Sequence, residues 1–413
     1  MKEISGGVCA PRGFRAAGVR CGIKASSQKR DLALIVSDKP CAAAGVFTTN
    51  RVQAASVIVS REHAAAGTLC AVIANSGNAN ACTGEAGLQA ARRMASLAAE
   101  RLSVSGGPVS AGQVAVASTG VIGVPLPIDV VEQGIGGLVA ALEHSAEGHD
   151  AALEAIMTTD TRKKGGAVET EIGGVTVRIG GMVKGSGMIH PNMATFLGFI
   201  TTDADISRDM LDQALRRAAR RSFNRVTVDG DCSTNDTLLA LANGEARNPP
   251  VETGGEGYEA FASALESLCV GLARAMARDG EGASRLMTVT VRGAAREDDA
   301  EVLAKSVASS SLVKAACFGA DANWGRVLCA LGYASVLFDP GAVSVRFASS
   351  AGTVLVCEKG GPAAFSEEDA ARILSQEEVE ILVDIEGGGQ GAASVWGCDL
   401  TCEYVRINGD YRS

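Results

Sequence analysis

The sequence predicts an α+β fold in which runs of strands are separated by helices. Short apolar strand-like segments follow one another in the first third of the chain and again after residue 286, without regular β-α alternation. This arrangement favours an α+β sandwich over a doubly wound sheet. With 413 residues the chain is too long for one small core, so two domains or one large body are expected. A charged stretch at 162–168 is the expected boundary between them.

The predicted strands rest on short apolar runs, and the helix at 85–102 rests on the amphipathic spacing of its apolar residues. Ser207 and Ser366 are expected N-caps, because each precedes acidic residues in the following turn. Strands are predicted at 31–37, 54–60, 69–75, 113–117, 175–179, 196–202, 226–229, 286–292, 335–338, 344–347, 379–385 and 393–407, the last with an interruption near Gly397. Helices are predicted at 85–102, 127–146, 150–157, 207–221, 259–278 and 366–375.

The composition excludes several classes of protein. A hydrophobic content of 46% with 21% charge is typical of an ordinary soluble globular protein. The 50 glycines follow no fixed period, which argues against collagen-like and repeat architectures. Only 4% aromatic residues and a net charge of −9 argue against a nucleic-acid partner. No stretch approaches the roughly 18 apolar residues of a membrane-spanning helix, so no membrane association is expected.

The twelve cysteines are scattered, with no C-x-x-C pair and no histidine at zinc-site spacing, so no metal site is expected. Cys70, Cys269 and Cys329 lie in apolar runs and are predicted to be core side chains. The N-terminal residues lack an apolar signal core. Reduced thiols in a cytoplasmic protein are therefore the expectation.

A glycine-rich stretch at 184–195 precedes the apolar run 196–200 and ends in Ala194-Thr195. If the chain cut itself between these two residues, Thr195 would become an N-terminal nucleophile. A hydroxyl needs a base to remove its proton, and a new α-amine, with a pKa of about 8, is such a base. The alternative is a glycine-rich hairpin ahead of an ordinary strand.

The turn after the predicted strand 113–117 offers a second chemical feature. Thr119-Gly120 can present a hydroxyl and a backbone N–H to a developing oxyanion, because glycine permits close approach of the backbone. The alternative is a strand-to-helix turn closed by glycine.

Acids and hydroxyls are dense at 227–237, where the spacing of Asp229, Asp231 and Ser233 superficially matches a calcium loop. A calcium hand is rejected, because its sixth position is Thr234 instead of glycine and its twelfth is Ala240 instead of glutamate. An active-site wall or a structural turn remains.

Glu281 lies between two glycines at the predicted end of a long helix. It is either a solvated turn residue or a carboxylate that receives a substrate ammonium. Ser186, two residues after Lys184, is a minor candidate for a Ser-Lys nucleophile. A Ser-His-Asp site is disfavoured, because His63, His144 and His149 lie in Ala/Glu-rich segments, where solvated side chains are expected.

These segments together resemble the ornithine acetyltransferases of arginine biosynthesis, also called bifunctional glutamate N-acetyltransferases. The resemblance covers nearly the whole chain. It comprises APRGFRAAG at 10–18, FTTNR at 47–51, NSGNANACTG at 75–84, STGVIG at 118–123, KGSGMIHPNMAT at 184–195, TVDGDCSTNDT at 227–237, RDGEGA at 278–283, FGADANWGR at 318–326 and YVRIN at 404–408.

The resemblance implies a layered α/β/β/α sandwich of the self-cleaving, N-terminal-nucleophile-like acetyltransferase kind. Cleavage between Ala194 and Thr195 would give an α chain of residues 1–194 and a β chain of residues 195–413. The two chains would stay associated, as an α2β2 heterotetramer. No cofactor is implied, and acetyl-CoA is a possible co-substrate.

The resemblance also implies a ping-pong reaction in which Thr195 takes an acetyl group from N-acetylornithine and passes it to glutamate. Thr119 and Gly120 would form the oxyanion hole. Lys184 can pair with an α-carboxylate, and Glu281 can receive the ornithine ammonium. The implied substrate-binding set is Thr158, Lys184, Thr195, Glu281, Asn408 and Ser413. Ser413 stands where threonine is common in the family, and Thr159 competes with Thr158.

Two alternatives to acetyl transfer stay open. Water could replace glutamate as acceptor, which would make the protein a self-processing amide hydrolase or aminopeptidase. In a non-enzymatic alternative, the chain stays uncut and its glycine-rich loop is structural.

Overall fold

A long strand, β3 (Leu32–Phe47), connects the two halves of the first sheet. In the computed structural model, which describes residues 1–24, 27–190 and 196–410, the first half of β3 pairs with β4 (Thr68–Asn78). The second half pairs with β10 (Thr237–Ala242). The register of the β3·β4 pair shifts between Val36 and Cys41.

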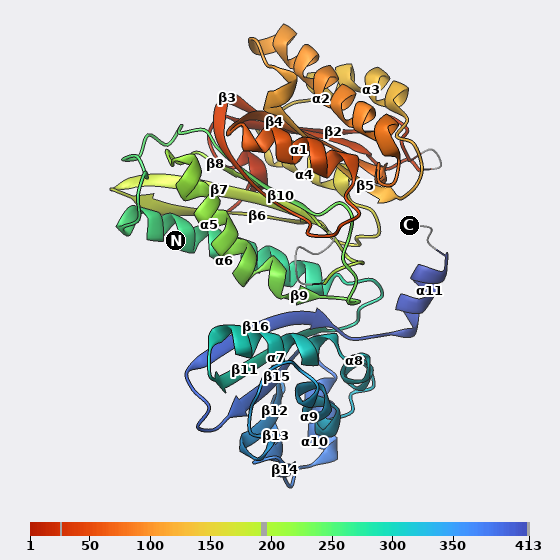
Figure 1. Ribbon diagram of the computed structural model, residues 1–413, viewed down its shortest axis with the longest axis vertical. Helices are drawn as coiled ribbons and strands as arrows, with labels where there is room; N and C mark the ends of the chain where they lie inside the picture. The colour runs from red at the N-terminus through yellow and green to blue at the C-terminus, as the bar shows by residue number, and fades with distance from the viewer. Residues whose placement is uncertain (25–26, 191–195, 411–413) are drawn as a thin grey trace.

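In the described part of the chain, this sheet has the order β1-β6-β7-β8-β10-β3-β4-β5, with β2 beside β3 (Figure 1). The pairs β4·β5 and β8·β10 are parallel, and the others are antiparallel. The remaining strands are β1 (Lys2–Ile4), β2 (Phe14–Val19), β5 (Val114–Val121), β6 (Lys164–Ile172), β7 (Val175–Lys184) and β8 (Leu197–Thr202).

The two half-sheets face each other, and alternating side chains decide which layer each residue joins. Phe199 and Leu241 point inward and share a core cluster with Ile35 and Val72 of the opposite half-sheet. The outer face of the β7-β8-β10 half is covered by α5 (Arg208–Arg221) and α6 (Glu256–Arg278). The outer face of the other half is covered by α1 (Ala55–Ala65), α2 (Gly84–Gly106) and α3 (Ile128–Ala140), while α4 (Ala146–Ile156) joins the inner cluster. The predicted α/β/β/α sandwich is confirmed.

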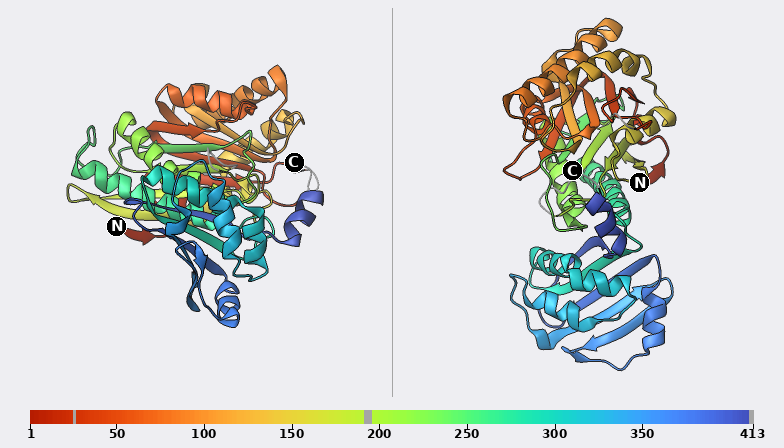
Figure 2. Two further views of the ribbon diagram at one scale, coloured as in Figure 1. Left: turned by 60° about the horizontal axis from the view of Figure 1, so that its bottom comes forward. Right: turned by 90° about the vertical axis from the view of Figure 1, so that its right-hand side faces the viewer.

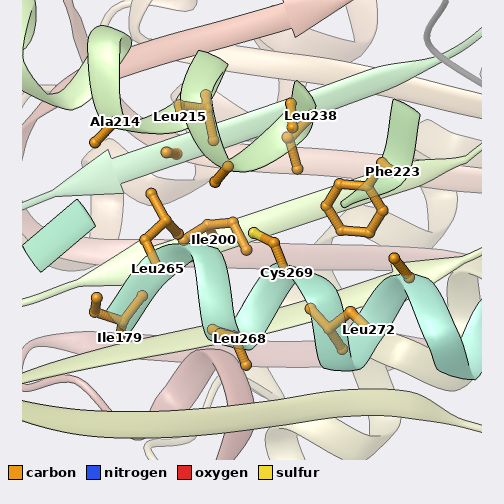
Figure 3. Close-up of a cluster of buried hydrophobic side chains, with 14 of the residues drawn as sticks. Ile179, Ile200, Ala214, Leu215, Phe223, Leu238, Leu265, Leu268, Cys269 and Leu272 are labelled. Carbon is orange, nitrogen blue, oxygen red and sulfur yellow. The ribbon is translucent and has the colours of Figure 1, made fainter. Parts of the chain in front are cut away.

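Helix α6 is long and apolar enough to cross a membrane by length and composition, with a mean hydropathy of 1.3 over its best window. Its apolar side chains instead form a core: Leu265, Cys269 and Leu272 pack toward Ile200 and Leu238 of the sheet (Figure 3). This packing accounts for the hydropathy of α6 as that of a core helix.

A second sheet forms the body drawn at the bottom of Figure 1. Leu286, Trp396 and Cys398 of this sheet join the core cluster of α6, so the two bodies pack against each other. In the described residues its order is β14-β13-β12-β15-β11-β16-β9. Four helices, α7 (Glu297–Ser309), α8 (Ser311–Phe318), α9 (Trp324–Gly332) and α10 (Glu367–Leu374), contribute to its single core cluster. The strands are β9 (Val226–Thr227), β11 (Leu286–Ala294), β12 (Val343–Ser349), β13 (Gly352–Glu358), β14 (Gly361–Pro362), β15 (Glu378–Ile385) and β16 (Gly391–Cys398).

The last helix, α11 (Cys402–Asp410), returns from β16 to the side of the first body (Figure 2). It has no buried residues, so its place depends on a few polar contacts. Short 3-10 helices complete the described secondary structure at Gly7–Cys9, Ala111–Gln113, Phe223–Arg225 and Pro340–Ala342.

Four predicted strands are wrong in whole or in part. Segment 54–60 lies almost entirely in helix α1, segment 335–338 has no strand, and only Val226–Thr227 of 226–229 is a strand. The strand predicted at 393–407 ends at Cys398, next to the expected interruption at Gly397, and does not resume. The boundary expected at 162–168 is also wrong, because β6 begins inside it and pairs along its length with β7. Both predicted N-caps are confirmed: Ser207 accepts from Met210 N and Ser366 from Asp369 N.

All twelve cysteines are free thiols. Cys70 and Cys269 are buried as predicted, whereas Cys329 is exposed. The prediction for Cys329 is wrong because helix α9 buries its neighbours Val327, Ala330 and Leu331 and turns the thiol outward.

The prediction of a solvated His149 is wrong. The side chain is only 6% exposed, and its Nδ1 accepts a hydrogen bond from Val8 N at 3.2 Å. A Cβ at Gly7 or Gly165 would lie within 2.4 Å of the imidazole ring, so two glycines make room for it. Burial lowers the pKa of His149 to about 4, because the charged imidazolium loses its hydration.

Because His149 is buried as the neutral imidazole, the free energy of unfolding should fall as the pH is lowered. The unfolded chain binds a proton near pH 6.5 and the folded chain only near pH 4, so stability is complete above pH 6.5 and lost on acidification toward pH 4. The loss is at most about 3 kcal/mol. Denaturant titrations of His149→Gln should show a shallower decline over this window. Equal slopes in His149→Gln and the wild type would contradict the assignment.

Candidate functional site

A polar pocket lies where β5 and β7 end and where β10 begins. It encloses about 580 Å³, part of it open to solvent. Its walls also come from the loop after α4, the turn after α6 and helix α11, so segments far apart in sequence meet there. The lining residues are Ala79, Thr119, Gly120, Ile122, Thr158, Thr159, Lys184, Gly187, Met188, Ser233, Thr234, Asn235, Glu281 and Asn408.

Thr119 and Gly120 lie near the end of β5, so the turn predicted directly after residue 117 is wrong. The pairing of this end of β5 with β4 is irregular, and Thr119 and Gly120 are called the oxyanion turn below. This segment requires its glycine. Gly120 has φ +131°, and a Cβ there would lie 2.4 Å from the carbonyl carbon of Gly77 and 2.6 Å from Asn78 N. Both atoms are backbone, so neither can move aside cheaply. The backbone of the turn is therefore pressed against β4 at the wall of the pocket.

Lys184, the last residue of β7, is 3% exposed, and its Nζ donates to Thr119 Oγ1 at 3.0 Å. Burial lowers the pKa of Lys184, whereas the Asp160 carboxylate opposes this shift. Because Thr119 Oγ1 accepts from Lys184, its own hydroxyl proton is available to a ligand. The pair is thus a donor site at the pocket wall.

A buried ion network stands behind Lys184. Lys164 Nζ lies 2.6 Å from Asp160 Oδ1 and 2.6 Å from Asp279 Oδ2, and these side chains are at most 3% exposed. Burial by itself raises the pKa of Asp160, but Lys164 and Lys184 outweigh it and lower this pKa to about 2. Asp160 also accepts from Thr158 N at 3.0 Å and Gly185 N at 2.7 Å. The network therefore fixes the loop after α4 against the end of β7.

Glu281 is a buried carboxylate of the pocket, which excludes the solvated-turn alternative. Its side chain accepts from Thr159 Oγ1 at 2.7 Å and from Asn408 Nδ2 at 2.8 Å. A Cβ at Gly187 would lie 2.4 Å from the Glu281 carboxyl carbon, so the glycine-rich loop leaves space for this group. The contact with Asn408 also ties α11 to the pocket.

Thr158 and Thr159 both line the pocket but differ in their hydroxyls. Thr159 Oγ1 bonds to Glu281 and, at 2.7 Å, to Ser186 Oγ. The Thr158 hydroxyl makes no hydrogen bond within the part of the chain that the structure describes. This difference favours Thr158 as the ligand-binding member of the pair.

The Ser-Lys alternative is not supported by these contacts, since Ser186 bonds to Thr159 whereas Lys184 bonds to Thr119. Nor do the acids at 229–231 form a cation loop. Asp229 accepts from Met188 N at 2.7 Å and from Ile189 N at 2.9 Å, and so holds the glycine-rich loop. Among the described residues, no group of three or more His, Cys, Asp or Glu side chains could hold a metal ion.

The predicted polar wall is present, since Ser233, Thr234 and Asn235 line the pocket. Asn235 Nδ2 donates to the carbonyls of Ala79 and Ser118, both at 2.7 Å. Sequence reasoning singled out this segment but gave no role to Asn235 or Asp236, and it missed Asp160. Asp160 was missed because its partners Gly185 N and, through Lys164, Asp279 come from distant parts of the chain.

Of the predicted site residues, Thr119, Gly120, Thr158, Lys184, Glu281 and Asn408 converge on this pocket. Ala194, Thr195 and Ser413 lie outside the described residues, and their roles stay predictions. Phe196, which follows Thr195 in the sequence, is buried, and its N–H donates to Asp236 Oδ1 at 3.1 Å.

Fold and pocket together define a two-body α+β protein whose layered domain holds a small polar pocket, furnished with one buried ammonium and one buried carboxylate. Such a donor and acceptor set suits a small ligand with charges of both signs.

Comparisons with known proteins identify the relatives of the chain. The profile of the ArgJ family matches residues 15–413. The arginine biosynthesis bifunctional protein ArgJ of Symbiobacterium thermophilum is 55% identical over 414 residues, covering 100% of both chains. That of Caldanaerobacter subterraneus is 47% identical over 413 residues, again covering 100% of both. A solved ornithine acetyltransferase of Mycobacterium tuberculosis, complexed with ornithine, is 45% identical, covers 46% of this chain and 96% of that one, and has a TM-score of 0.43.

The chain belongs to the ArgJ family. The family expected from the sequence is therefore confirmed.

Proposed function

We propose that this protein cuts itself between Ala194 and Thr195 and then uses Thr195 to carry an acetyl group from N2-acetyl-L-ornithine to L-glutamate. It is an acetyltransferase of arginine biosynthesis, as its membership of the ArgJ family implies. The observation that carries the proposed chemistry is the convergence of Thr119, Gly120, Lys184 and Glu281 on one pocket.

In the cutting step, the Thr195 hydroxyl attacks the carbonyl carbon of Ala194 and forms a tetrahedral oxyanion. Collapse of this intermediate breaks the peptide C–N bond and moves the acyl group from nitrogen to oxygen. Water then hydrolyses the ester, which leaves a carboxylate on Ala194 and a free α-amine and hydroxyl on Thr195. The Thr119 hydroxyl and the Gly120 N–H stabilise the oxyanions.

In the transfer step, the Thr195 α-amine takes the hydroxyl proton while the oxygen attacks the acetyl carbonyl. The Thr195 α-amine, now protonated, gives this proton to the leaving nitrogen of ornithine. Ornithine leaves as the free amine, and an acetyl ester remains on Thr195. The amine of glutamate then attacks this ester, the bond between the acetyl carbon and the Thr195 oxygen breaks, and N-acetylglutamate leaves. The proton lost by the attacking amine passes through the Thr195 α-amine to the Thr195 oxygen and restores the hydroxyl. Lys184 pairs with the substrate α-carboxylate, and Glu281 receives the side-chain ammonium of ornithine.

Three further properties belong to the proposal. Acetyl-CoA serves as a second acetyl donor, in line with the word bifunctional in the names of the relatives. The α and β chains assemble as an α2β2 heterotetramer, which the mass of the native protein in solution tests. The protein works in the cytoplasm, and its twelve free thiols support a reducing compartment.

A direct assay tests the proposed reaction. Purified protein, incubated with N-acetylornithine and glutamate, should yield N-acetylglutamate and ornithine in equal amounts. Acetate release without N-acetylglutamate would favour the amide hydrolase instead. A single uncut band at 42.0 kDa on a denaturing gel would refute self-cutting. A parallel reaction with acetyl-CoA and glutamate decides whether the second donor is used.

Glu281→Gln should raise the KM for N-acetylornithine more than the KM for glutamate. The amide keeps the shape of the side chain but removes the charge that binds the ornithine ammonium. A charge-assisted hydrogen bond is worth about 1.5–3 kcal/mol, so the expected rise is about 10- to 100-fold. Steady-state kinetics with each substrate varied separately measure it. Equal rises in both KM values would contradict the assignment of Glu281 to the ammonium.

A further inference from the structure

Two adjacent residues, Asn235 and Asp236, contact both halves of the proposed catalytic centre. Asn235 holds the segment that leads into Thr119, whereas Asp236 holds the strand that follows Thr195. We propose that they are positioning residues, which set the oxyanion turn against the strand of the nucleophile. This inference rests on the acetyltransferase function proposed above.

The Asn235 side chain is an amide bridge between two carbonyls. Its Nδ2 donates to Ala79 O and Ser118 O, both at 2.7 Å, and its Oδ1 accepts from Thr234 Oγ1 at 2.5 Å. The Ser118 carbonyl belongs to the same peptide unit as the N–H of Thr119. Because a peptide unit is planar, a hydrogen bond to its oxygen fixes the orientation of the chain entering Thr119.

Asp236 fixes the other half. It is fully buried, and its Oδ1 accepts from Phe196 N at 3.1 Å. Its backbone carbonyl accepts from Thr48 N at 3.0 Å, and the next residue, Thr237, donates from its N–H to Phe196 O at 3.1 Å. Phe196 is thus held at both its N–H and its carbonyl by consecutive residues.

The order of the sheet shows why such a link matters. Thr119 lies on β5 and Phe196 immediately precedes β8, and β10, β3 and β4 lie between these two strands in the sheet. The ladder alone therefore sets their separation through three intervening strands. Asn235 and Asp236 connect them through adjacent residues. A misplacement of about 1 Å can cost about 100-fold in rate, so a direct link is valuable.

The second carboxyl oxygen of Asp236, Oδ2, differs from Oδ1 in its hydrogen bonding. Oδ2 is buried and has no hydrogen-bond partner among the described residues. Burial raises the pKa of Asp236 well above the usual range, while the Phe196 N–H, the Thr48 side chain and Lys184 oppose the shift. Keeping a carboxyl in this position costs free energy.

The test compares Asn235→Asp with Asn248→Asp. Asn248 is a matched control: it is buried, its Nδ2 also donates to two carbonyls, those of Asp205 and Pro249, and it is absent from the pocket lining. Both substitutions place a carboxylate against two carbonyl oxygens, so both should lower the melting temperature. Only Asn235→Asp should lower kcat, by about 100-fold with little change in KM, because a misplaced oxyanion turn weakens transition-state binding.

The rate of self-cutting is a second readout, since it uses the same turn. Slow cutting of folded Asn235→Asp, when Asn248→Asp cuts normally, also supports the proposal. Cutting and transfer at the rates of the control would overturn it. Should Asn235→Asp not fold, Asn235→Ser and Asn248→Ser replace the pair under the same criterion. Wild-type protein is assayed alongside, because absent acetyl transfer there refutes the proposed function itself.

The role of Asp236 is tested by comparing a disruptive substitution with a conservative one. Asp236→Ala removes the acceptor of Phe196 N and should slow both cutting and transfer. Asp236→Asn keeps an oxygen acceptor in the same place and should recover most of the lost rate. Equal rates in the two variants would show that the bond to Phe196 does not position the strand.

Discussion

Thr195→Ala should remain a single chain of 42.0 kDa with no measurable acetyl transfer. Alanine has no hydroxyl to attack the preceding carbonyl, so the peptide bond stays intact. Without cutting there is no free α-amine at this position to act as base, and without the hydroxyl there is no atom to carry the acetyl group. Loss of the nucleophile in a covalent hydrolase lowers kcat by about 10⁶-fold, and a similar loss is expected here.

The measurements are a denaturing gel and the N-acetylornithine-to-glutamate assay. Thr195→Ser is the matched control, because it keeps a hydroxyl and should cut and transfer at a reduced rate. A melting temperature close to that of wild type shows that Thr195→Ala is folded. Acetyl transfer by the uncut alanine variant would contradict the role of Thr195.

Gly120→Ala should lower kcat by about 100- to 1,000-fold, the usual cost of losing one oxyanion donor. The new Cβ would lie 2.4 Å from the carbonyl carbon of Gly77, within backbone that cannot yield without moving β4. The turn must therefore shift, and the Gly120 N–H and the Thr119 hydroxyl shift with it. KM should change little, because the loss falls on the transition state.

Gly123→Ala separates this clash from simple backbone strain. Gly123 also has positive φ, at +79°, but a Cβ there would meet no atom within 4 Å. The cost of this control should be about 1 kcal/mol of stability and little activity. Equal kcat values for Gly120→Ala and Gly123→Ala would refute the oxyanion role of the turn.

The pattern of apolar residues predicted much of the layered domain, and its failures have physical causes. Segment 54–60 combines Val57, Ile58 and Val59, which favour a strand by propensity, yet tertiary packing of Val57 and Val59 stabilises a helix. A strand was also predicted at 335–338, but Leu337 is fully exposed and this segment pairs with no strand among the described residues. Strand β10 was missed, although its wholly apolar text is typical of a strand buried on both faces.

The site was predictable only in part. The resemblance named Thr119, Lys184 and Glu281, and the structure brings them together although the sequence separates them by up to 162 residues. Residues that support them are harder to find. Gly185 N, which donates to Asp160, lies 25 residues away in the sequence, and Ala79 O, which accepts from Asn235, lies 156 residues away. Such contacts leave no periodic signal in a sequence.

The position of β8 in the first sheet has a consequence for how the molecule must be made. A cut before β8 would leave β8 and β10 in one product, inserted between β7 and β3 of the other. The product with residues 1–194 would, by itself, leave the hydrogen-bonding edges of β7 and β3 without partners. Such unpaired edges promote aggregation. Folding must therefore come before cutting. Residues 1–194 and 195–413, synthesised as separate chains, should assemble poorly. In the intact precursor, β8 and β10 can pair with β7 and β3 during folding because all four strands belong to one chain.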